Sequence, residues 1–428
     1  MTSIGRPAIM QWHCTIADRI TMYHPRTIKE PWLKASKEFP VLLLTGPRQV
    51  GKTTFLQHVC EKDRRYVTLD DPGIRALAND DPALFLQRFR PPVLIDEIQY
   101  APKLLPYVKM AVDSDRKPGV FWLTGSQQFQ MMKGVSETLA GRVAIVNMLG
   151  FSNRERHKLA LDVPPFLPTN KDLAEREKSA GKTRLAGIYK DIWLGSFPAM
   201  VAGPVKDRDV FYGSYLQTYL QRDVRDLAQV GNEAGFLRFV KACAARTAQM
   251  LNVAELARDA DVSVNTAKAW LSILQASFQV FLLPPYHTNV TKRLVKAPKL
   301  YFLDTGLCAY LTEWSSPQTL EAGAMGGAIF ETHAFVEIVK SWWHRMRTPP
   351  LYYYRDKDGR EVDFLFVQDR RLHPVEAKKS ATPKSDWTVP LASLKRFSKE
   401  VGEGGVVCLS PQLLPLGPKA NAIPVGLI

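Results

Sequence analysis

The sequence has few cysteines, no long apolar run and no evident internal repeat. Its five cysteines are scattered along 428 residues, without a Cys-x-x-Cys pair or a cluster of His and Cys residues. This distribution argues against a zinc module and against a disulfide framework. No run approaches the roughly 18 apolar residues of a transmembrane helix, and the N-terminus lacks the apolar core of a signal peptide. We therefore expect a cytoplasmic protein with no membrane partner.

The chain has fewer acidic residues than basic residues. The chain has 57 Lys and Arg residues against 42 Asp and Glu residues, which gives a formal net charge of +15. Such a surplus favours a polyanionic partner, nucleic acid first and an anionic membrane surface second. A length of 428 residues with 46% hydrophobic residues is enough for two or three domains with their own cores.

A glycine-rich stretch follows a short apolar run near residue 45. Residues 41–45 are typical of a buried parallel strand, and residues 46–53, GPRQVGKT, fit the pattern G-x-x-x-x-G-K-[ST]. Glycines let backbone N–H groups curl around phosphates, the lysine reaches the β- and γ-phosphates, and the threonine hydroxyl holds Mg²⁺. We therefore predict ATP and Mg²⁺ as ligands, with the nucleotide bound by Gly46, Pro47, Arg48, Gln49, Val50, Gly51, Lys52, Thr53 and Thr54.

Two further apolar runs end in polar residues. The run in PPVLIDEIQY ends in Asp96, suited to contact Mg²⁺ together with Thr53, and Glu97, suited to polarise the attacking water. The run in VFWLTGSQQ ends near Ser126, which is placed to sense the γ-phosphate. With YVTLDDP and RVAIVNM, these runs give five strands that alternate with helical segments, and this alternation predicts a parallel sheet with helices on both faces.

These motifs resemble a known family. Gly-Pro-Arg-Gln-Val-Gly-Lys-Thr-Thr, Leu-Asp-Asp-Pro, Ile-Asp-Glu-Ile-Gln and Leu-Thr-Gly-Ser-Gln, in this order, are similar to the prokaryotic AAA+ ATPases of the archaeal-ATPase branch, which carry a C-terminal domain of unknown function. The resemblance implies a P-loop AAA+ core. In that family a Leu-Ala-Gly-Arg segment follows the Leu-Thr-Gly-Ser-Gln motif, and here this segment ends at Arg142. Arg142 is therefore a candidate γ-phosphate sensor, in cis or, in a homo-oligomer, in trans; an exposed arginine before a strand is the alternative.

The pattern changes twice after residue 150. Residues 152–190 are charged and contain proline, as in a linker, whereas NVAELARDADVSVNTAKAWLSILQ predicts helix, turn and helix. The second helix would present Asn265, Thr266 and Lys268 outward, and the following hairpin would act as a wing. We expect this winged helix to contact DNA, although such domains also bind proteins. The basic residues assigned to the wing are Lys292, Arg293, Lys296 and Lys299.

The C-terminal part contains an acidic hairpin. If Asp369 and Arg370 form its turn, Asp363 lies opposite Glu376, with Cβ atoms within roughly 5 Å of each other. Two opposed carboxylates repel each other, and a divalent cation between them would resolve the conflict. Glu331 begins the apolar stripe of a preceding helix and needs a partner there.

A helix with Glu, then Asp on one strand and Glu-x-Lys on the next resembles the PD-(D/E)xK nuclease superfamily over roughly residues 320–410. The resemblance implies that Asp363 and Glu376 bind Mg²⁺, that Glu331 supports the metal and that Lys378 activates water. The predicted fold is therefore an α/β multidomain chain with a restriction-endonuclease-like C-terminal domain. Its predicted parts are an N-terminal extension (1–37), an AAA+ ATPase core (38–150), a helical linker or lid (151–235), a winged helix (236–315) and a nuclease-like domain (316–428).

Three functions are compatible with these patterns. The first is an ATPase whose nucleotide state controls DNA binding and cleavage by the tail. The second is an ATP-driven switch or scaffold that binds protein partners and has a catalytically silent tail. The third is an accessory ATPase of mobile elements that handles DNA without cutting it. The first function is favoured because the chain has all four residues of the nuclease pattern, namely Glu331, Asp363, Glu376 and Lys378.

Overall fold

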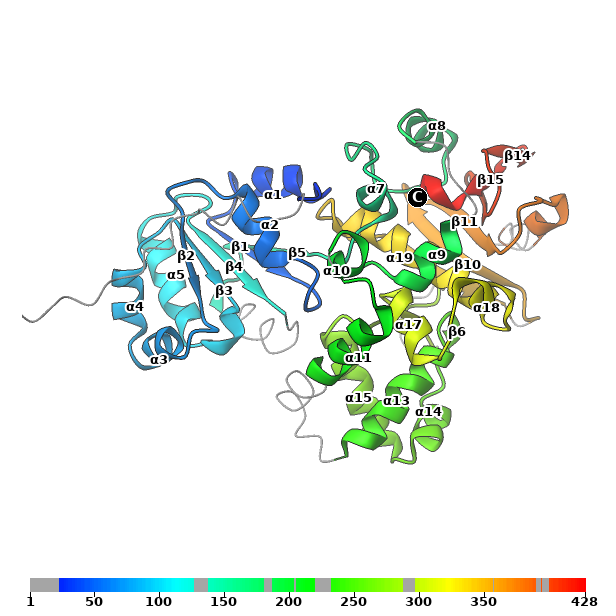
Figure 1. The fold of residues 1–428 in the computed structure, drawn as a ribbon. Helices are drawn as coiled ribbons and strands as arrows, with labels where there is room; N and C mark the ends of the chain where they lie inside the picture. Colours follow the sequence, from blue (N-terminus) through cyan, green and yellow to red (C-terminus); the bar gives the residue numbers. More distant parts are fainter. Residues whose placement is uncertain are drawn as a thin grey trace, which may run out of the picture.

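The computed structural model describes residues 23–126, 138–180, 187–203, 205–219, 232–287, 297–356, 358–389, 394 and 400–428. Its elements form three groups: an α/β sandwich from the N-terminal part, a helical lobe from the middle and a second sheet from the C-terminal part (Figure 1). No helix within these ranges is long and apolar enough to cross a lipid bilayer.

The N-terminal sandwich is built on the predicted sheet. Its strands have the order β2-β3-β4-β1-β5, and every neighbouring pair is parallel. The prediction of five parallel strands is therefore confirmed. The strands are β1 (Val41–Thr45), β2 (Arg65–Thr68), β3 (Val93–Asp96), β4 (Phe121–Gly125) and β5 (Val143–Asn147).

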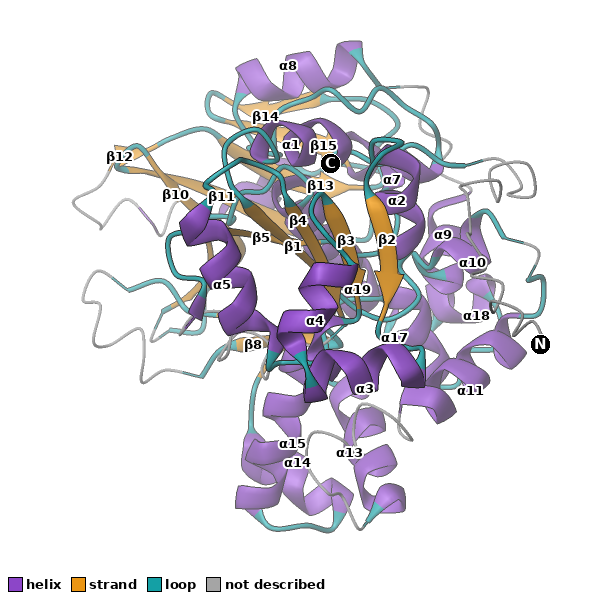
Figure 2. Ribbon diagram, turned by 90° about the vertical axis from the view of Figure 1, so that its left-hand side faces the viewer, coloured by secondary structure: helices purple, strands orange, loops and turns teal. Residues whose placement is uncertain are grey.

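Helices cover both faces of this sheet (Figure 2). Val41 and Leu43 point into a core shared with α3 (Pro72–Asp80), α4 (Pro82–Arg88) and α5 (Leu104–Ser114). Leu42 and Leu44 point to the other face, where α1 (Lys29–Ala35) and α2 (Lys52–Val59) pack. Since successive strand residues point to opposite faces, a continuous apolar run is what a strand covered on both sides requires.

The middle of the chain is mostly helical. The two helices expected between residues 253 and 275 are present as α14 (Val253–Ala260) and α15 (Val264–Ala276), and Asp261, with φ of 56°, ends the first. They follow α13 (Glu233–Ala245) and β6 (Gln249–Met250) and precede β7 (Val280–Leu283) and β8 (Lys299–Phe302); the antiparallel sheet has the order β6-β8-β7. The earlier helices are α7 (Asn153–Arg156), α8 (Asn170–Lys178), α9 (Ile188–Leu194), α10 (Pro198–Val201) and α11 (Arg208–Tyr219).

The C-terminal part forms a mixed sheet packed against α19 (Gly326–Trp343). The predicted hairpin is confirmed: Gln368 pairs with Arg371, and the turn residues Asp369 and Arg370 both have positive φ, as a two-residue hairpin turn requires. The sheet comprises β9 (Leu351–Arg355), β10 (Glu361–Gln368), β11 (Arg371–Lys378), β12 (Glu400–Val401), β13 (Gly404–Cys408), β14 (Leu414–Gly417) and β15 (Ala420–Pro424), and α17 (Thr305–Leu311) and α18 (Pro317–Ala322) precede α19.

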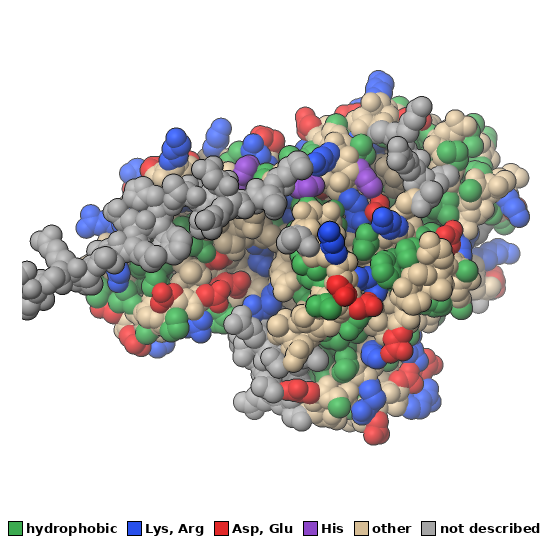
Figure 3. All heavy atoms as spheres, viewed as in Figure 1, with side chains coloured by type: hydrophobic (Ala, Val, Ile, Leu, Met, Phe, Trp, Pro, Cys, Tyr) green, Lys and Arg blue, Asp and Glu red, His purple; other side chains and the backbone are tan. Residues whose placement is uncertain are grey.

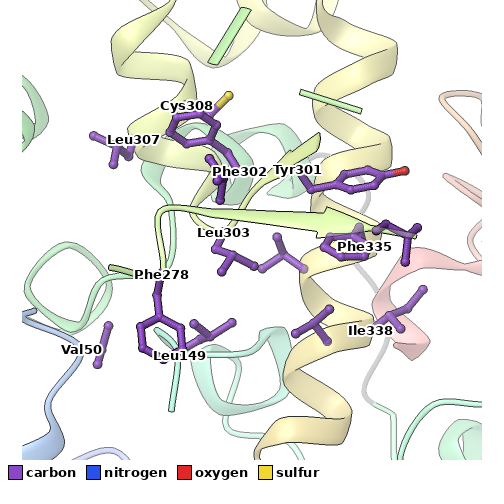
Figure 4. Packing of buried hydrophobic residues seen from close by; sticks show 14 of the residues in the cluster. Val50, Leu149, Phe278, Tyr301, Phe302, Leu303, Leu307, Cys308, Phe335 and Ile338 are labelled. Atoms are coloured by element: carbon purple, nitrogen blue, oxygen red, sulfur yellow. The ribbon is translucent and has the colours of Figure 1, made fainter. Parts of the chain in front are cut away.

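One apolar core joins the three groups. Val50 of the P-loop and Leu149 after β5 belong to the same buried cluster as β8 and α19. Figure 4 shows the side chains of Val50, Leu149 and Phe278 on one side of this cluster, and those of Tyr301 and Phe335 on the other. The P-loop and the C-terminal part therefore share one hydrophobic core.

Candidate active site and carboxylate cluster

The P-loop lies at the carboxyl end of β1, which pairs with β4 and β5. Gly46 has φ of 149°, and a Cβ there would lie 2.0 Å from the carbonyl oxygen of Met148, so no larger residue fits. Gly51 has φ of 87° and is the residue before α2, where a left-handed conformation turns the loop into the helix. The loop thus directs the first backbone N–H groups of α2 toward the space where phosphates bind in such sites.

The lysine and threonine of the loop already have partners. Nζ of Lys52 is buried and donates to the carbonyl oxygens of Gly46 (2.9 Å) and Pro47 (2.8 Å). The hydroxyl of Thr53 donates to both carboxylate oxygens of Asp96, each at 3.0 Å. A hydroxyl and a carboxylate in contact form the oxygen donor set that Mg²⁺ prefers, so these residues fit the predicted metal.

Asp96 is a buried carboxylate held by three hydroxyls. Besides Thr53, it accepts hydrogen bonds from Thr124 and from Tyr66 (3.1 Å). Burial, together with the charge of neighbouring Glu97, raises the pKa of Asp96 above its usual range despite these hydrogen bonds. A bound cation would offset this raised pKa, because it favours the charged carboxylate.

Glu97 is oriented by residues of two neighbouring strand ends. Its backbone is left-handed (φ 59°), and its N–H donates to the hydroxyl of Thr124 (3.1 Å). Its carboxylate accepts from Ser126 (3.2 Å) and from the side-chain amide of Gln99. The structure therefore brings the predicted residues Lys52, Thr53, Asp96, Glu97 and Ser126 to one edge of the sheet. Gln99 was not predicted, although it stands in the motif Ile-Asp-Glu-Ile-Gln, and Thr124 was predicted only as part of the polar strand end that includes Ser126.

The structure does not bring Arg142 to this edge. It precedes β5, and its guanidinium pairs with Asp113 through bonds of 2.6 and 3.0 Å. Because the strands are parallel, the start of β5 lies at the edge of the sheet opposite the P-loop. Arg142 therefore does not reach a nucleotide bound to its own chain, and a role in trans stays a prediction.

An unexpected residue supports the P-loop from the N-terminal segment. Arg26 is buried and donates to the carbonyl oxygens of Val50 (3.0 Å) and Leu149 (2.6 Å). Its Nε lies 3.2 Å from Oε1 of Glu155, whose side chain also lies 3.4 Å from Nδ1 of His344 in the C-terminal part. Although burial alone would raise the pKa of Glu155, Arg26 and His344 hold that pKa well below its usual range. No motif marks Arg26 in the sequence.

The predicted DNA-contacting residues have different outcomes. Lys292, Arg293 and Lys296 lie outside the described residues. On α15, Asn265 and Lys268 are exposed as predicted, whereas Thr266 is half-buried and its hydroxyl bonds to that of Ser263. On the face seen in Figure 3, the lobe with α13, α14 and α15 carries both acidic and basic side chains.

The assignment of Lys299 to the wing is wrong. Its side chain is only 3% exposed, and its Nζ lies 2.9 Å from Oε1 of Glu331 and 3.2 Å from Oδ1 of Asp363, and also contacts Glu361. Although burial alone would lower the pKa of Lys299, these three carboxylates raise it above its usual range. Lys299 is therefore a charged residue in the interior and does not face DNA.

The other members of this carboxylate cluster come from α19, β10 and β11. The register that pairs Phe364 with Val375 places Asp363 opposite Glu376, as predicted. Asp363 accepts a hydrogen bond from the backbone N–H of Ala377 (3.0 Å), and Nζ of Lys378 lies 2.8 Å from Oε2 of Glu376.

Burial and mutual repulsion raise the pKa values of two carboxyl groups in the cluster. Burial and then the charge of Asp363 raise the pKa of Glu331 to about 7 and that of Glu376 to about 8. The hydroxyl of Tyr301 donates to Oε1 of Glu331 at 2.6 Å. The signal that could have placed Lys299 here is strand alternation, because Lys299 and Tyr301 point to the same face of β8 and both contact Glu331.

The cluster does not fit the predicted metal as it stands. Within the described residues, no group of three or more His, Cys, Asp and Glu side chains is arranged to hold a metal ion. The resemblance implies Mg²⁺ between Asp363 and Glu376, and Oδ1 of Asp363 is already paired with the ammonium group of Lys299.

Models of three known domain families match separate parts of the chain. An AAA domain matches residues 38–157, a domain of unknown function (DUF8612) matches residues 187–318, and another (DUF4143) matches residues 326–428. Uncharacterized proteins from Mycobacterium bovis and Mycobacterium tuberculosis are each 30% identical over 353 residues, which span 82% of this chain and 73% of theirs.

Solved structures show weaker similarity. The Walker-type ATPase of Pyrococcus abyssi has a TM-score of 0.40 at 14% identity, covering 69% of this chain and 97% of its own. RuvB of Thermotoga maritima has a TM-score of 0.30 at 15% identity, covering 60% and 87%. The sequence matches and the P-loop geometry agree, and the chain belongs to the family of AAA-type P-loop ATPases with a C-terminal DUF4143 domain that includes these mycobacterial proteins.

Proposed function

We propose that the chain binds and hydrolyses ATP with Mg²⁺, and that its nucleotide state controls DNA binding by the helical lobe. The observation that carries this proposal is the convergence of Lys52, Thr53, Asp96 and Glu97 at the carboxyl ends of neighbouring parallel strands. Lys52 would exchange its two loop carbonyl partners for phosphate oxygens. Bound Mg²⁺ would supply charge neutralisation at the phosphates.

Glu97 is the proposed general base. Ser126 and Gln99 hold its carboxylate in a fixed orientation, which favours removal of a proton from a water molecule. Because Ser126 contacts Glu97 directly, its proposed sensor role would act by turning the base as the nucleotide changes. The Thr53 hydroxyl and Asp96 would hold the metal, since the two are already in contact.

The helical lobe is the proposed DNA-binding part. Its order of helix, strand, two helices and two strands, with the sheet order β6-β8-β7, is that expected of a winged helix. The exposed side chains of Asn265, Lys268 and Ser272 follow one face of α15, the helix that would enter the major groove. The net charge of +15 supports a polyanionic partner.

DNA cleavage is not part of the proposed function. The nuclease resemblance implies a metal between Asp363 and Glu376, and the ammonium group of Lys299 pairs with Asp363, one of these two carboxylates. This observation favours the switch with a silent tail over the nuclease as the role of the C-terminal part. A homo-oligomer stays a proposal that rests on Arg142 acting in trans.

Two measurements test the ATPase part of the proposal. Lys52→Ala should lose ATP binding, because β- and γ-phosphate charges would lack a partner. Glu97→Gln should bind ATP with nearly unchanged affinity and hydrolyse it about 10²–10⁴-fold more slowly, the range for loss of a general base. Equal turnover by Glu97→Gln and the unmodified chain would remove Glu97 from this role.

The DNA part requires its own test. Neutralising Lys292, Arg293 and Lys296 together should weaken DNA binding and reduce the slope of log affinity against log salt by roughly one unit for each phosphate that is no longer bound. The matched control neutralises two lysines and one arginine on the exposed surface of the ATPase part, namely Lys103, Arg116 and Lys117. An unchanged slope in the first variant, or an equal change in the control, would indicate that the lobe binds a protein partner instead.

A further inference from the structure

Lys299 connects two parts of the chain that the family comparison separates. It lies on β8, in the three-stranded sheet of the helical lobe, whereas its carboxylate partners lie on α19 and β10. The strand supplies a second contact through Tyr301, whose hydroxyl donates to the same oxygen of Glu331 that pairs with Lys299. The carboxylate cluster is therefore part of an intramolecular interface.

The geometry around Nζ of Lys299 is that of a fully satisfied cation. An ammonium group has three N–H donors, and three carboxylates contact this one: Glu331 at 2.9 Å, Asp363 at 3.2 Å and Glu361. A Mg²⁺ ion would need the same oxygens at about 2.0–2.1 Å. The ammonium group and a divalent ion cannot share these oxygens, because both the space and the like charges exclude it.

The carboxylates of the cluster outnumber the cations that contact them. Four carboxylates are grouped here, those of Glu331, Glu361, Asp363 and Glu376, and the lysines in contact with them are Lys299 and Lys378. Arg355, on the exposed side, lies 3.6 Å from Glu361. Oε1 of Glu376 is buried without a hydrogen-bond partner, on a side chain that is only 3% exposed. Either a proton, in line with the raised pKa of Glu376, or a further cation can stabilise such a buried, unpaired carboxyl oxygen.

We propose that Lys299 is a tethered cation whose pairing with Glu331 and Asp363 keeps this carboxylate cluster closed to divalent ions. While Lys299 is in place, the C-terminal part is held against β8 without a metal. Without this ammonium group, the oxygens of Glu331, Asp363 and Glu376 would be left as a set of ligands for a divalent cation. This proposal goes beyond the proposed function, since neither ATP hydrolysis nor DNA binding requires it.

The test uses Lys299→Met in the full chain, with no nucleotide present, and titrates Mn²⁺ while the melting temperature is measured. Methionine keeps an unbranched side chain that is one atom shorter than lysine, and it removes the charge. The variant should gain a Mn²⁺-dependent rise in melting temperature, with half-saturation at a concentration at least about tenfold lower than in the unmodified chain. Adding Asp363→Asn should abolish that gain. Lys299→Arg is the matched control, since it keeps the charge and should gain nothing.

Several outcomes would overturn the proposal. One is an Asp363-dependent response to Mn²⁺ in the unmodified chain as strong as that of Lys299→Met. Another is a folded Lys299→Met that gains no response, and a third is a Lys299→Met chain that stays unfolded at millimolar Mn²⁺. Amine labelling of the unmodified chain gives an independent measure: Lys299 should react at least about tenfold more slowly than exposed Lys268, and equal rates would contradict its place in the cluster.

Discussion

Replacement of Arg26 by methionine should destabilise the ATPase part severely. The change removes an ion pair with Glu155 and hydrogen bonds to the carbonyl oxygens of Val50, Leu149 and Gly150. Glu155 remains fully buried, with His344 and two backbone N–H groups as its remaining partners. Breaking a buried pair by removing one member costs about 3–5 kcal/mol, a large share of a typical stability of about 5–15 kcal/mol.

Urea unfolding of four chains would measure the coupling directly. The chains are the unmodified protein, Arg26→Met, Glu155→Gln and the double variant. Because the two side chains are in contact, we expect a coupling free energy of about 2–3 kcal/mol. The control cycle uses Lys241 and Glu313, whose side chains are 2.7 Å apart but 45% and 75% exposed, and it should give no measurable coupling.

The same variant should also weaken nucleotide binding, because Arg26 fixes the Val50 carbonyl within the P-loop. ATP affinity should fall in Arg26→Met under conditions where the chain is still folded. A coupling no larger than that of the surface pair, with ATP affinity unchanged, would refute the idea that Arg26 supports the loop.

Three further outcomes follow from other residues. Gly46→Ala should lose nucleotide binding, measured with a fluorescent ATP analogue, because the new Cβ would displace the Met148 carbonyl 2.0 Å away. The folded-state pKa of Glu155 is lowered, so the charged carboxylate stabilises the fold fully above its unfolded pKa of about 4.3, and this stabilisation is lost as the pH falls below that value. The difference in free energy of unfolding between the unmodified chain and Glu155→Gln should therefore be constant from pH 8 to 6. It should shrink below about pH 5. Asp304→Ala should cost about 2–4 kcal/mol in urea unfolding, because its buried carboxylate accepts several hydrogen bonds, and a cost below about 0.5 kcal/mol would contradict this.

Local patterns predicted the parts of the site that are local in the chain. The P-loop, the Asp96–Glu97 pair and the hairpin turn at Asp369 each depend on neighbouring residues, so the sequence indicated them correctly. Lys299 was placed incorrectly because its partners lie 32 to 64 residues away, on elements whose approach no local pattern encodes. Arg26 was missed for the same reason, since its partners are backbone carbonyls, which leave no trace in the sequence.

The sequence also did not predict that the side of α19 opposite its apolar stripe is buried. The stripe led from Glu331 through Phe335, Ile338 and Trp342, and these side chains are largely buried. However, Glu337 and Lys340 are buried as well, because they meet the segment at residues 151–153 through Asn153 and Phe151. A helix covered on all sides loses the amphipathic signal from which burial is predicted.

The helix α1 changes where a functional fragment of this protein should begin. The AAA domain match starts at residue 38, yet Trp32 lies in the core, with its ring edge-on to those of Phe55 and Trp122 at centroid distances of 6.2 and 5.3 Å. A fragment cut at residue 38 would keep the whole P-loop motif and uncover the apolar face that Trp32 covers, so it should aggregate on expression. Fragments for biochemistry should therefore start before Tyr23, and ATPase activity missing from a shorter piece would reflect the exposure of this apolar face together with the loss of Arg26 beside the P-loop.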